Sequence, residues 1–426
     1  YSLNSISGKC ISLPMKSDLD QIMQETNVDA LWVWGAMYNN PDMVYFTGIH
    51  HANQVDLFKI RGREPLLYHF VSMEREEAKN SGLETHAYDE THPLDSYLQK
   101  FGGNLVDAIA YRMRDVLKEI GLVKGRIAIS GWDNLGSALA IIFRVKELLP
   151  EIEFFSFVQD SPIRQARLTK TPEEAAHIRQ MGILTTEVVG RTAEFLSLCT
   201  ARDELIHDPA GNPVTVGKVK EKINLWLAEL GAENPEETIF SIGRDAAIPH
   251  NTGNPQDVLR TGQPIVFDIF PREKGGGYFY DFTRTWCLGY APQEMQDMHQ
   301  QTLEVHHSII AALQPNTPFK VYQDMACDMF EKMGHATIRQ QYNLSEGYTH
   351  SIGHGLGLDI HENPFSGLTA TEKDILAIGS VFSIEPGLYY PSRNIGVRIE
   401  DTVYLTPQGN FEIMAEYPYD LILPIK

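Results

Sequence analysis

Four acidic residues in apolar, strand-like segments and one histidine-rich loop are the parts of this chain best suited to chemistry. Burying a carboxylate in an apolar strand costs free energy, so a lone acid in such a run is usually an edge-strand or capping residue. Four such acids around a loop with three histidines form a different pattern, because carboxylates and one imidazole suit a pair of divalent cations. A single zinc site would instead have four ligands that are mostly histidine nitrogens or cysteine sulfurs. The four acids are Asp268, Asp281, Glu385 and Glu400.

The acids fall into two predicted hairpins. Asp268 lies in the run PIVFDIF, and Asp281 follows 13 residues later in YFYDFTRTW, after a turn with three glycines. Glu385 lies in VFSIEPG, and Glu400 follows 15 residues later in VRIEDTVYL. Alternation and β-branched or aromatic residues in these runs are typical of strands. Antiparallel pairing would bring the two acids of each pair to one end, so the two hairpins together would form a metal cradle.

The loop HSIGHGLGLDIHENP carries the candidate imidazoles His350, His354 and His361. Their spacings of four and seven would place them on one helix face, but the intervening glycines each cost ~1 kcal/mol in a helix. We therefore expect an extended segment whose backbone passes close to a ligand. One of the three histidines would coordinate metal as neutral imidazole, and the others would donate hydrogen bonds to a substrate carbonyl or a developing oxyanion.

The remaining histidines are less distinctive. His250, in AAIPHNTG, is a fourth candidate for substrate binding, although a lone loop histidine is usually solvated. The pairs His50–His51 and His306–His307 have no acidic hairpin near them in sequence, so we expect them to be structural or surface residues.

These motifs resemble those of the creatinase, aminopeptidase P and prolidase group of metallopeptidases, which have the pita-bread fold and also include methionine aminopeptidase. The resemblance extends from about Arg167 to the end of the chain and rests on VFDIF, YDFTRTWCLG, HSIGHGLGLDIHENP, FSIEPGLYYP and GVRIEDTVYLT. The turn PREKGGGYFY is longer than the family usually has between its two aspartates, which leaves the conformation of this loop open.

The resemblance implies a role for each ligand candidate. Asp268 would bind one metal, and His354 and Glu385 would bind the second. Asp281 and Glu400 would bridge both. Two divalent cations are implied, with Mn²⁺ favoured and Zn²⁺ or Co²⁺ as alternatives, because such a site selects weakly among divalent ions.

The resemblance also implies the catalytic groups. Residues His250, His350 and His361 would contact substrate or stabilise the tetrahedral intermediate. Arg398 would support a metal ligand from outside the coordination sphere. Glu385 is the best candidate for proton transfer, because a terminal ligand keeps one oxygen free whereas bridging occupies both.

Length and charge define the class of protein. A chain of 426 residues is too long for one ordinary core and predicts two domains. A formal net charge of −20 argues against a nucleic-acid-binding surface. A membrane span would need a run of ~18 apolar residues, and the sequence contains none. Four scattered cysteines (Cys10, Cys199, Cys287 and Cys327) indicate reduced thiols and therefore the cytoplasm.

The expected fold class is α/β (α+β), in three segments. Residues 1–14, before Met15, lack the charged and apolar regions of a secretory signal, so we expect an added leader. Alternating helix and strand patterns in 15–165 predict a smaller N-terminal domain with a mixed sheet. The resemblance implies a pita-bread catalytic domain over 166–426, with a curved antiparallel sheet and flanking helices. Its first helix should begin at Pro172, capped by Thr171.

Three classes of function compete. A dinuclear metallopeptidase is preferred to a metal-free creatinase-like hydrolase or a non-catalytic peptide-binding relative, because those relatives typically lose ligand carboxylates and none is lost here. The N-terminal domain disfavours methionine aminopeptidase. We expect an Xaa-Pro aminopeptidase acting on peptides with proline second, with Xaa-Pro dipeptidase (prolidase) as the alternative. The resemblance implies a homodimer or a dimer of dimers.

Overall fold

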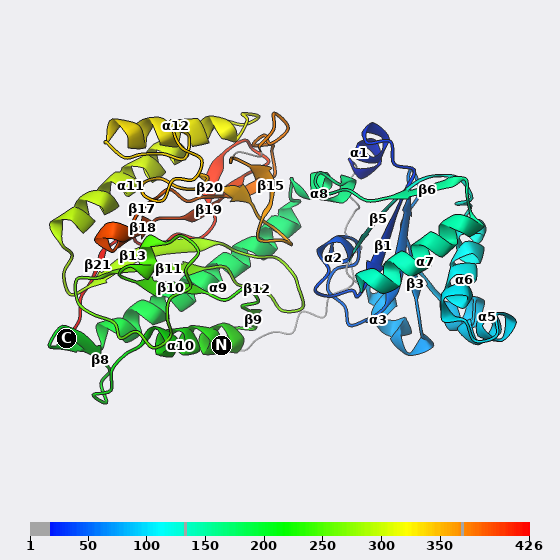
Figure 1. Cartoon of the computed structure of the whole chain (residues 1–426), viewed down its shortest axis with the longest axis horizontal. Helices are drawn as coiled ribbons and strands as arrows, with labels where there is room; N and C mark the ends of the chain where they lie inside the picture. Colours follow the sequence, from blue (N-terminus) through cyan, green and yellow to red (C-terminus); the bar gives the residue numbers. More distant parts are fainter. Residues whose placement is uncertain (1–17, 132–133, 368–369) are drawn as a thin grey trace. The chain divides into compact units, whose positions relative to one another are not determined.

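The computed structural model describes residues 18–131, 134–367 and 370–426 (Figure 1). The predicted leader and Cys10 lie outside these residues. The chain divides into an N-terminal unit, Tyr1–Arg167 with Gly275–Gly277, and a C-terminal unit, Leu168–Lys274 with Tyr278–Lys426. The domain bounds expected from the sequence, 15–165 and 166–426, stay a prediction. Among the described helices, none combines the length and apolar character needed to cross a bilayer.

The N-terminal unit is built on a six-stranded mixed sheet in the order β4-β3-β2-β1-β5-β6, as the alternating pattern predicts. Strand β1 pairs antiparallel with β2 and parallel with β5. The strands are β1 Ala30–Gly35, β2 Val55–Ile60, β3 Leu66–His69, β4 Glu84–Ala87, β5 Gly125–Gly131 and β6 Ile152–Phe155. The helices are α1 Leu19–Glu25, α2 Pro41–Thr47, η1 Ser72–Glu74, α3 Arg75–Asn80, α4 Tyr88–Thr91, α5 Leu94–Lys100, α6 Leu105–Glu119, α7 Leu135–Leu148 and α8 Pro162–Arg167.

Both faces of this sheet are covered. Successive residues of a strand point to opposite faces. In β1, Trp32 and Trp34 accordingly belong to one core cluster, whereas Leu31 and Val33 belong to another. Burial on both faces explains why DALWVWG is a nearly continuous apolar run rather than an alternating one.

The C-terminal unit contains two larger sheets and three strand pairs. One sheet has the order β10-β11-β13-β21 and the other β15-β14-β16-β19-β20. The first comprises β10 Ile239–Ile242, β11 Pro264–Ile269, β13 Phe282–Leu288 and β21 Ile422–Leu423. The second comprises β14 His354–Gly355, β15 Glu362–Phe365, β16 Val381–Ile384, β19 Asp401–Leu405 and β20 Phe411–Ile413. The pairs are β7 Thr200–Arg202 with β8 Leu205–His207, β9 Ala232–Glu233 with β12 Arg272–Glu273, and β17 Gly387–Tyr390 with β18 Ile395–Arg398.

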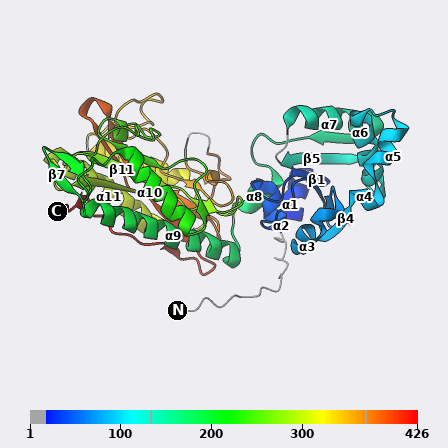
Figure 2. The same cartoon turned by 90° about the horizontal axis from the view of Figure 1, so that it is seen from below.

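Two pairs of helices flank these sheets. Thr171 and Glu174 form a capping box at the start of α9, as the sequence predicts. Helices α9 and α10 contact each other (Figure 1 and Figure 2). Helices α11 and α12 also contact each other (Figure 1). The helices are α9 Pro172–Ser197, α10 Val216–Glu229, α11 Gln293–Ala312 and α12 Lys320–Lys332, with short turns η2 Asp245–Ala247 and η3 Pro391–Arg393.

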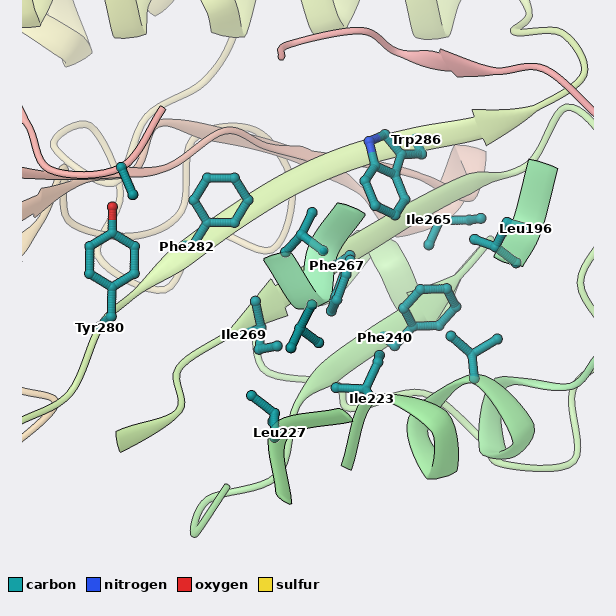
Figure 3. Packing of buried hydrophobic residues seen from close by; sticks show 14 of the residues in the cluster. Leu196, Ile223, Leu227, Phe240, Ile265, Phe267, Ile269, Tyr280, Phe282 and Trp286 are labelled. Atoms are coloured by element: carbon teal, nitrogen blue, oxygen red, sulfur yellow. The ribbon is translucent and has the colours of Figure 1, made fainter. Parts of the chain in front are cut away.

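A row of aromatic rings anchors the sheet that carries the first acid pair. Phe240, Phe267 and Trp286 come from β10, β11 and β13, and adjacent rings lie edge to face at 5.4 and 5.5 Å. Figure 3 shows this row near Ile223 and Leu227 of α10, and all five residues share one buried cluster. Edge-to-face pairs add to the free energy of burial. The strands therefore rest on a close-packed support.

Candidate metal centre

Both predicted acid pairs lie at the ends of paired strands. Strand β11 runs antiparallel to β13, which places Asp268 near the end of β11 and Asp281 one residue before β13. Strand β16 runs antiparallel to β19, with Glu385 just after β16 and Glu400 just before β19. The short hairpin of β17 and β18 lies between the two glutamates.

The histidine loop is extended, as expected, and two of its glycines lie against neighbouring backbone. A Cβ atom on Gly353 would lie 2.0 Å from the carbonyl oxygen of Ser383, and one on Gly355 would lie 2.0 Å from that of Asn363. Neighbouring backbone therefore takes the space that a side chain would need at these two positions. The expectation that the backbone of this loop passes close to a ligand stays a prediction. Only glycine lets the segment 353–355 approach β15 and β16 so closely.

A single cavity of about 510 Å³ gathers the predicted residues. Within it, His354 Nε2 lies 3.4 Å from Glu385 Oε1 and 3.6 Å from Asp281 Oδ2. Ligand atoms of Asp281, His354 and Glu400 all lie within 4.8 Å of one another. The predicted residues that line the cavity are Asp268, Asp281, His354, Glu385, Glu400, His250, His350, His361 and Arg398.

Three buried carboxylate oxygens at this site have no hydrogen-bond partner. They are Asp268 Oδ1, Asp281 Oδ1 and Glu400 Oε1. A buried, unpaired carboxylate oxygen costs a large desolvation free energy. Divalent cations prefer oxygen ligands of this kind and would offset that cost. The donor set therefore fits bound divalent cations.

Burial and mutual repulsion disturb the titration of these carboxyl groups. Burial, together with the charges of Asp268 and Glu385, raises the pKa of Asp281 well above its usual value. Burial and the charge of Asp281 likewise raise the pKa of Glu400. Burial raises the pKa of Glu385 to about 8, with Arg398 opposing the shift and Asp268 adding to it. Buried like charges that a single arginine only partly offsets produce this pattern, and bound cations would reverse it.

The imidazole of His354 is held neutral. Burial, with a smaller effect from His361, lowers the pKa of His354 to about 3. The ring of His361 lies edge-on to that of His354, with centroids 4.3 Å apart. A neutral imidazole is the form that coordinates metal, so His354 is ready to act as a ligand at neutral pH.

Arg398 links the first aspartate to the histidine loop. Its guanidinium donates to Asp268 Oδ2, and Nη1 donates to the hydroxyl of Tyr389 at 2.7 Å. That hydroxyl lies 2.9 Å from His350 Nε2, while His350 Nδ1 lies 2.8 Å from the carbonyl oxygen of Ser351. Both ring nitrogens of His350 therefore have protein partners. The prediction from sequence missed Tyr389. Its position in the motif FSIEPGLYYP, close to Glu385, could have identified it.

Two hydroxyl residues were also missed. Thr283 donates to Glu400 Oε2 at 2.6 Å, and Ser383 donates to Glu385 Oε1 at 3.3 Å. Ser383 lies two residues before Glu385, and Thr283 lies two residues after Asp281. Residues two apart on a strand share a face. The spacing from the predicted acids could therefore have identified both hydroxyl residues from the sequence.

The remaining candidate His250 lies at the cavity wall, and neither of the two histidine pairs lines it. His250 is exposed and lines the cavity. His306 is buried beside Asp401, whereas His307 and His51 are exposed and His50 is half-buried. The prediction that these two pairs are structural or surface residues is consistent with their positions.

Comparison with known proteins gives consistent results. Residues 176–407 match the model of metallopeptidase family M24. An uncharacterised peptidase of Staphylococcus aureus strain MW2 is 26% identical over 410 residues, covering 94% of this chain and 99% of that protein. The prolidase of Pyrococcus horikoshii OT3 has a TM-score of 0.69 at 22% identity, covering 95% of this chain and 99% of that one. The X-Pro aminopeptidase of Thermotoga maritima MSB8 has a TM-score of 0.70 at 21% identity, covering 93% and 97%.

These similarities confirm the expected fold class and the resemblance to the pita-bread group. The family match covers more than half of the chain and includes every motif from Asp268 to Glu400. The chain is therefore a metallopeptidase and belongs to family M24.

Proposed function

We propose that this metallopeptidase is an Xaa-Pro aminopeptidase that uses two divalent cations, with Xaa-Pro dipeptidase activity as the second candidate. The observation that carries the proposal is one cavity that brings together the four predicted acids, a neutral histidine and three buried oxygens without hydrogen-bond partners. The names of similar structures, a prolidase and an X-Pro aminopeptidase, support specificity for the bond before proline. Free, buried Cys199, Cys287 and Cys327 suit the cytoplasm as location.

The proposed ligands are the five residues expected from the sequence. Asp268 would hold one cation, His354 and Glu385 the other, and Asp281 and Glu400 both. Carboxylate oxygens with one imidazole suit Mn²⁺, and also Zn²⁺ or Co²⁺. When bound, the cations would polarise the scissile carbonyl and activate water for attack.

The protein's own groups would handle protons and orientation. Glu385 would take a proton from the attacking water and pass it to the proline nitrogen, since it lies at the cavity wall and, as a terminal ligand, would keep one carboxylate oxygen free. His361 would donate a hydrogen bond to the developing oxyanion, and His250 and His350, which also line the cavity, would contact the substrate. Arg398 would hold Asp268 in place through its charged hydrogen bond.

The charge of the cavity favours the aminopeptidase over the dipeptidase. A dipeptide substrate brings its own carboxylate close to the scissile bond, and a cationic side chain would stabilise it there. Among the described residues that line the cavity, Arg398 is the only lysine or arginine, and it is already paired with Asp268. Glu236 and Glu237 add negative charge to the same cavity. A longer peptide, whose carboxylate lies farther away, avoids this repulsion.

We therefore expect Xaa-Pro-Yaa peptides to be hydrolysed with a higher kcat/KM than the matching Xaa-Pro dipeptides. The measurement is kcat/KM for both sets in enzyme loaded with Mn²⁺, with Xaa-Ala-Yaa peptides as the control for proline specificity. Faster hydrolysis of the dipeptides would make Xaa-Pro dipeptidase the correct assignment. Equal rates with alanine in place of proline would remove proline specificity altogether.

We also propose that the protein forms a homodimer or a dimer of dimers. Helix α7 of the N-terminal unit carries an exposed apolar stripe of Leu135, Leu139 and Phe143, which are 72%, 40% and 62% exposed. Spacing by four places these residues on one helix face, and exposed apolar patches mark interaction surfaces. Light scattering should show an oligomer that Phe143→Glu weakens. The control Leu225→Glu, at a position of α10 that is 57% exposed, should leave the oligomer unchanged. A fully active monomer would exclude this proposal.

A further inference from the structure

Arg284 is buried three residues beyond Asp281, and every donor group of its guanidinium has a partner. Its side chain is 1% exposed. The planar guanidinium presents its donors in a fixed fork, so partners on several segments are held in one geometry. It donates from Nε to Pro418 O at 3.0 Å, from Nη1 to Thr283 O at 3.0 Å and Glu400 O at 2.8 Å, and from Nη2 to Asp401 Oδ1 at 2.8 Å and Tyr417 O at 2.9 Å.

These bonds join the two strands that carry the proposed bridging ligands. Thr283, next to Arg284, donates to the carboxylate of Glu400, and Thr402 donates to the backbone oxygen of Asp281 at 2.8 Å. The threonines thus cross-link the ends of β13 and β19 in both directions. Arg284 adds the charged contact to the backbone of Glu400, so the position of that ligand depends on a side chain that does not line the cavity.

The partner of Arg284 is itself held from two further segments. Asp401 Oδ2 accepts a hydrogen bond from the Tyr419 hydroxyl at 2.7 Å and lies 3.2 Å from His306 Nε2 of α11. The side chains of Arg284, Asp401 and His306 are all fully or almost fully buried. A buried network with these contacts tolerates little displacement. It ties the residue beside Glu400 to α11 and to the segment Tyr417–Tyr419.

We infer that Arg284 is a positioning residue of the metal centre: with Asp401 and Tyr419, it fixes the distance between Asp281 and Glu400. This inference rests on the proposed role of those two acids as bridging ligands. Hydrogen bonds to residues around a metal site typically change metal affinity by about 10–100-fold when they are lost. Arg284 thereby couples the C-terminal segment of the chain to cation binding.

The test uses the full-length protein, stripped of metal and titrated with Mn²⁺ by calorimetry. Arg284→Lys keeps the positive charge but loses the fork, and we expect its Mn²⁺ affinity to fall about 10–100-fold. Tyr419→Phe removes one contact to Asp401 and should weaken Mn²⁺ binding less, in the same direction. In the cobalt-loaded protein, the visible absorption of Co²⁺ should shift in both variants, because the ligand geometry changes.

Arg112→Met is the matched control. Arg112 is 2% exposed and stacks on Phe70 and Tyr88 in the N-terminal unit, so its loss lowers stability without touching the metal centre. Unchanged Mn²⁺ affinity and cobalt spectrum in folded Arg284→Lys would overturn the inference. If that variant does not fold, unchanged values in Tyr419→Phe would overturn it instead.

A second variant separates this inference from the proposed ligand set. Glu400→Gln removes a proposed ligand directly and should lose Mn²⁺ affinity in any case. Loss in Glu400→Gln without loss in Arg284→Lys removes only the role of Arg284. Full Mn²⁺ affinity in Glu400→Gln would remove the ligand assignment on which the inference rests.

Discussion

Glu385→Gln is expected to lower kcat strongly. Apart from substitutions of the proposed bridging acids, no other single substitution at the cavity wall should lower kcat as much. Glutamine keeps the size of the side chain but provides no carboxylate to bind a cation or accept a proton. General acid–base catalysis alone contributes about 10²–10⁴-fold, and weaker cation binding adds to the loss. The measurement is kcat in enzyme saturated with Mn²⁺, so that the loss of proton transfer is separated from the loss of metal affinity.

His361→Ala provides the comparison for this prediction. It should fold, keep its cations and lose about 10²–10³-fold in turnover, which is the typical cost of removing one donor to a developing oxyanion. The order of the two effects therefore distinguishes proton transfer from electrostatic stabilisation. Turnover close to wild type in metal-saturated Glu385→Gln would contradict the assignment of Glu385 as the proton-transfer group.

Removal of divalent cations is expected to abolish hydrolysis and to reverse the way stability depends on pH. In the metal-free protein, burial raises the pKa of Glu385 to about 8 from the ordinary 4.5, and those of Asp281 and Glu400 also rise. The folded state then binds more protons than the unfolded state, so the free energy of unfolding falls as pH rises from about 5 to 8. Cation binding needs ionised carboxylates, so stabilisation by Mn²⁺ should grow over the same interval.

Thermal unfolding checks this prediction. The Tm of chelated protein should fall between pH 5 and 8, and the increase in Tm produced by Mn²⁺ should become larger. Readdition of Mn²⁺ should restore activity, with two equivalents per chain needed for full turnover. Hydrolysis that survives thorough chelation, or restoration by a single equivalent, would contradict the proposed pair of cations.

The sequence by itself determined the hairpins and the candidate ligands. An acid inside an apolar strand is costly to bury, so Asp268 and Asp281 had to have a compensating partner. Strand periodicity and the glycine turn placed them at one end of two antiparallel strands, which the pairing of β11 with β13 confirms. These features are local, and local patterns are what a sequence displays directly.

Only the tertiary structure decided what supports those ligands. The guanidinium of Arg284 contacts Pro418, 134 residues away, and that of Arg398 contacts Asp268, 130 residues away. The glycines beside His354 make room for the backbone of Ser383 and Asn363, which lie on other strands. Periodicity and propensity give no information about which distant side chain completes a hydrogen bond. That information arises only when the chain packs, because each buried polar group must then find its partner in space.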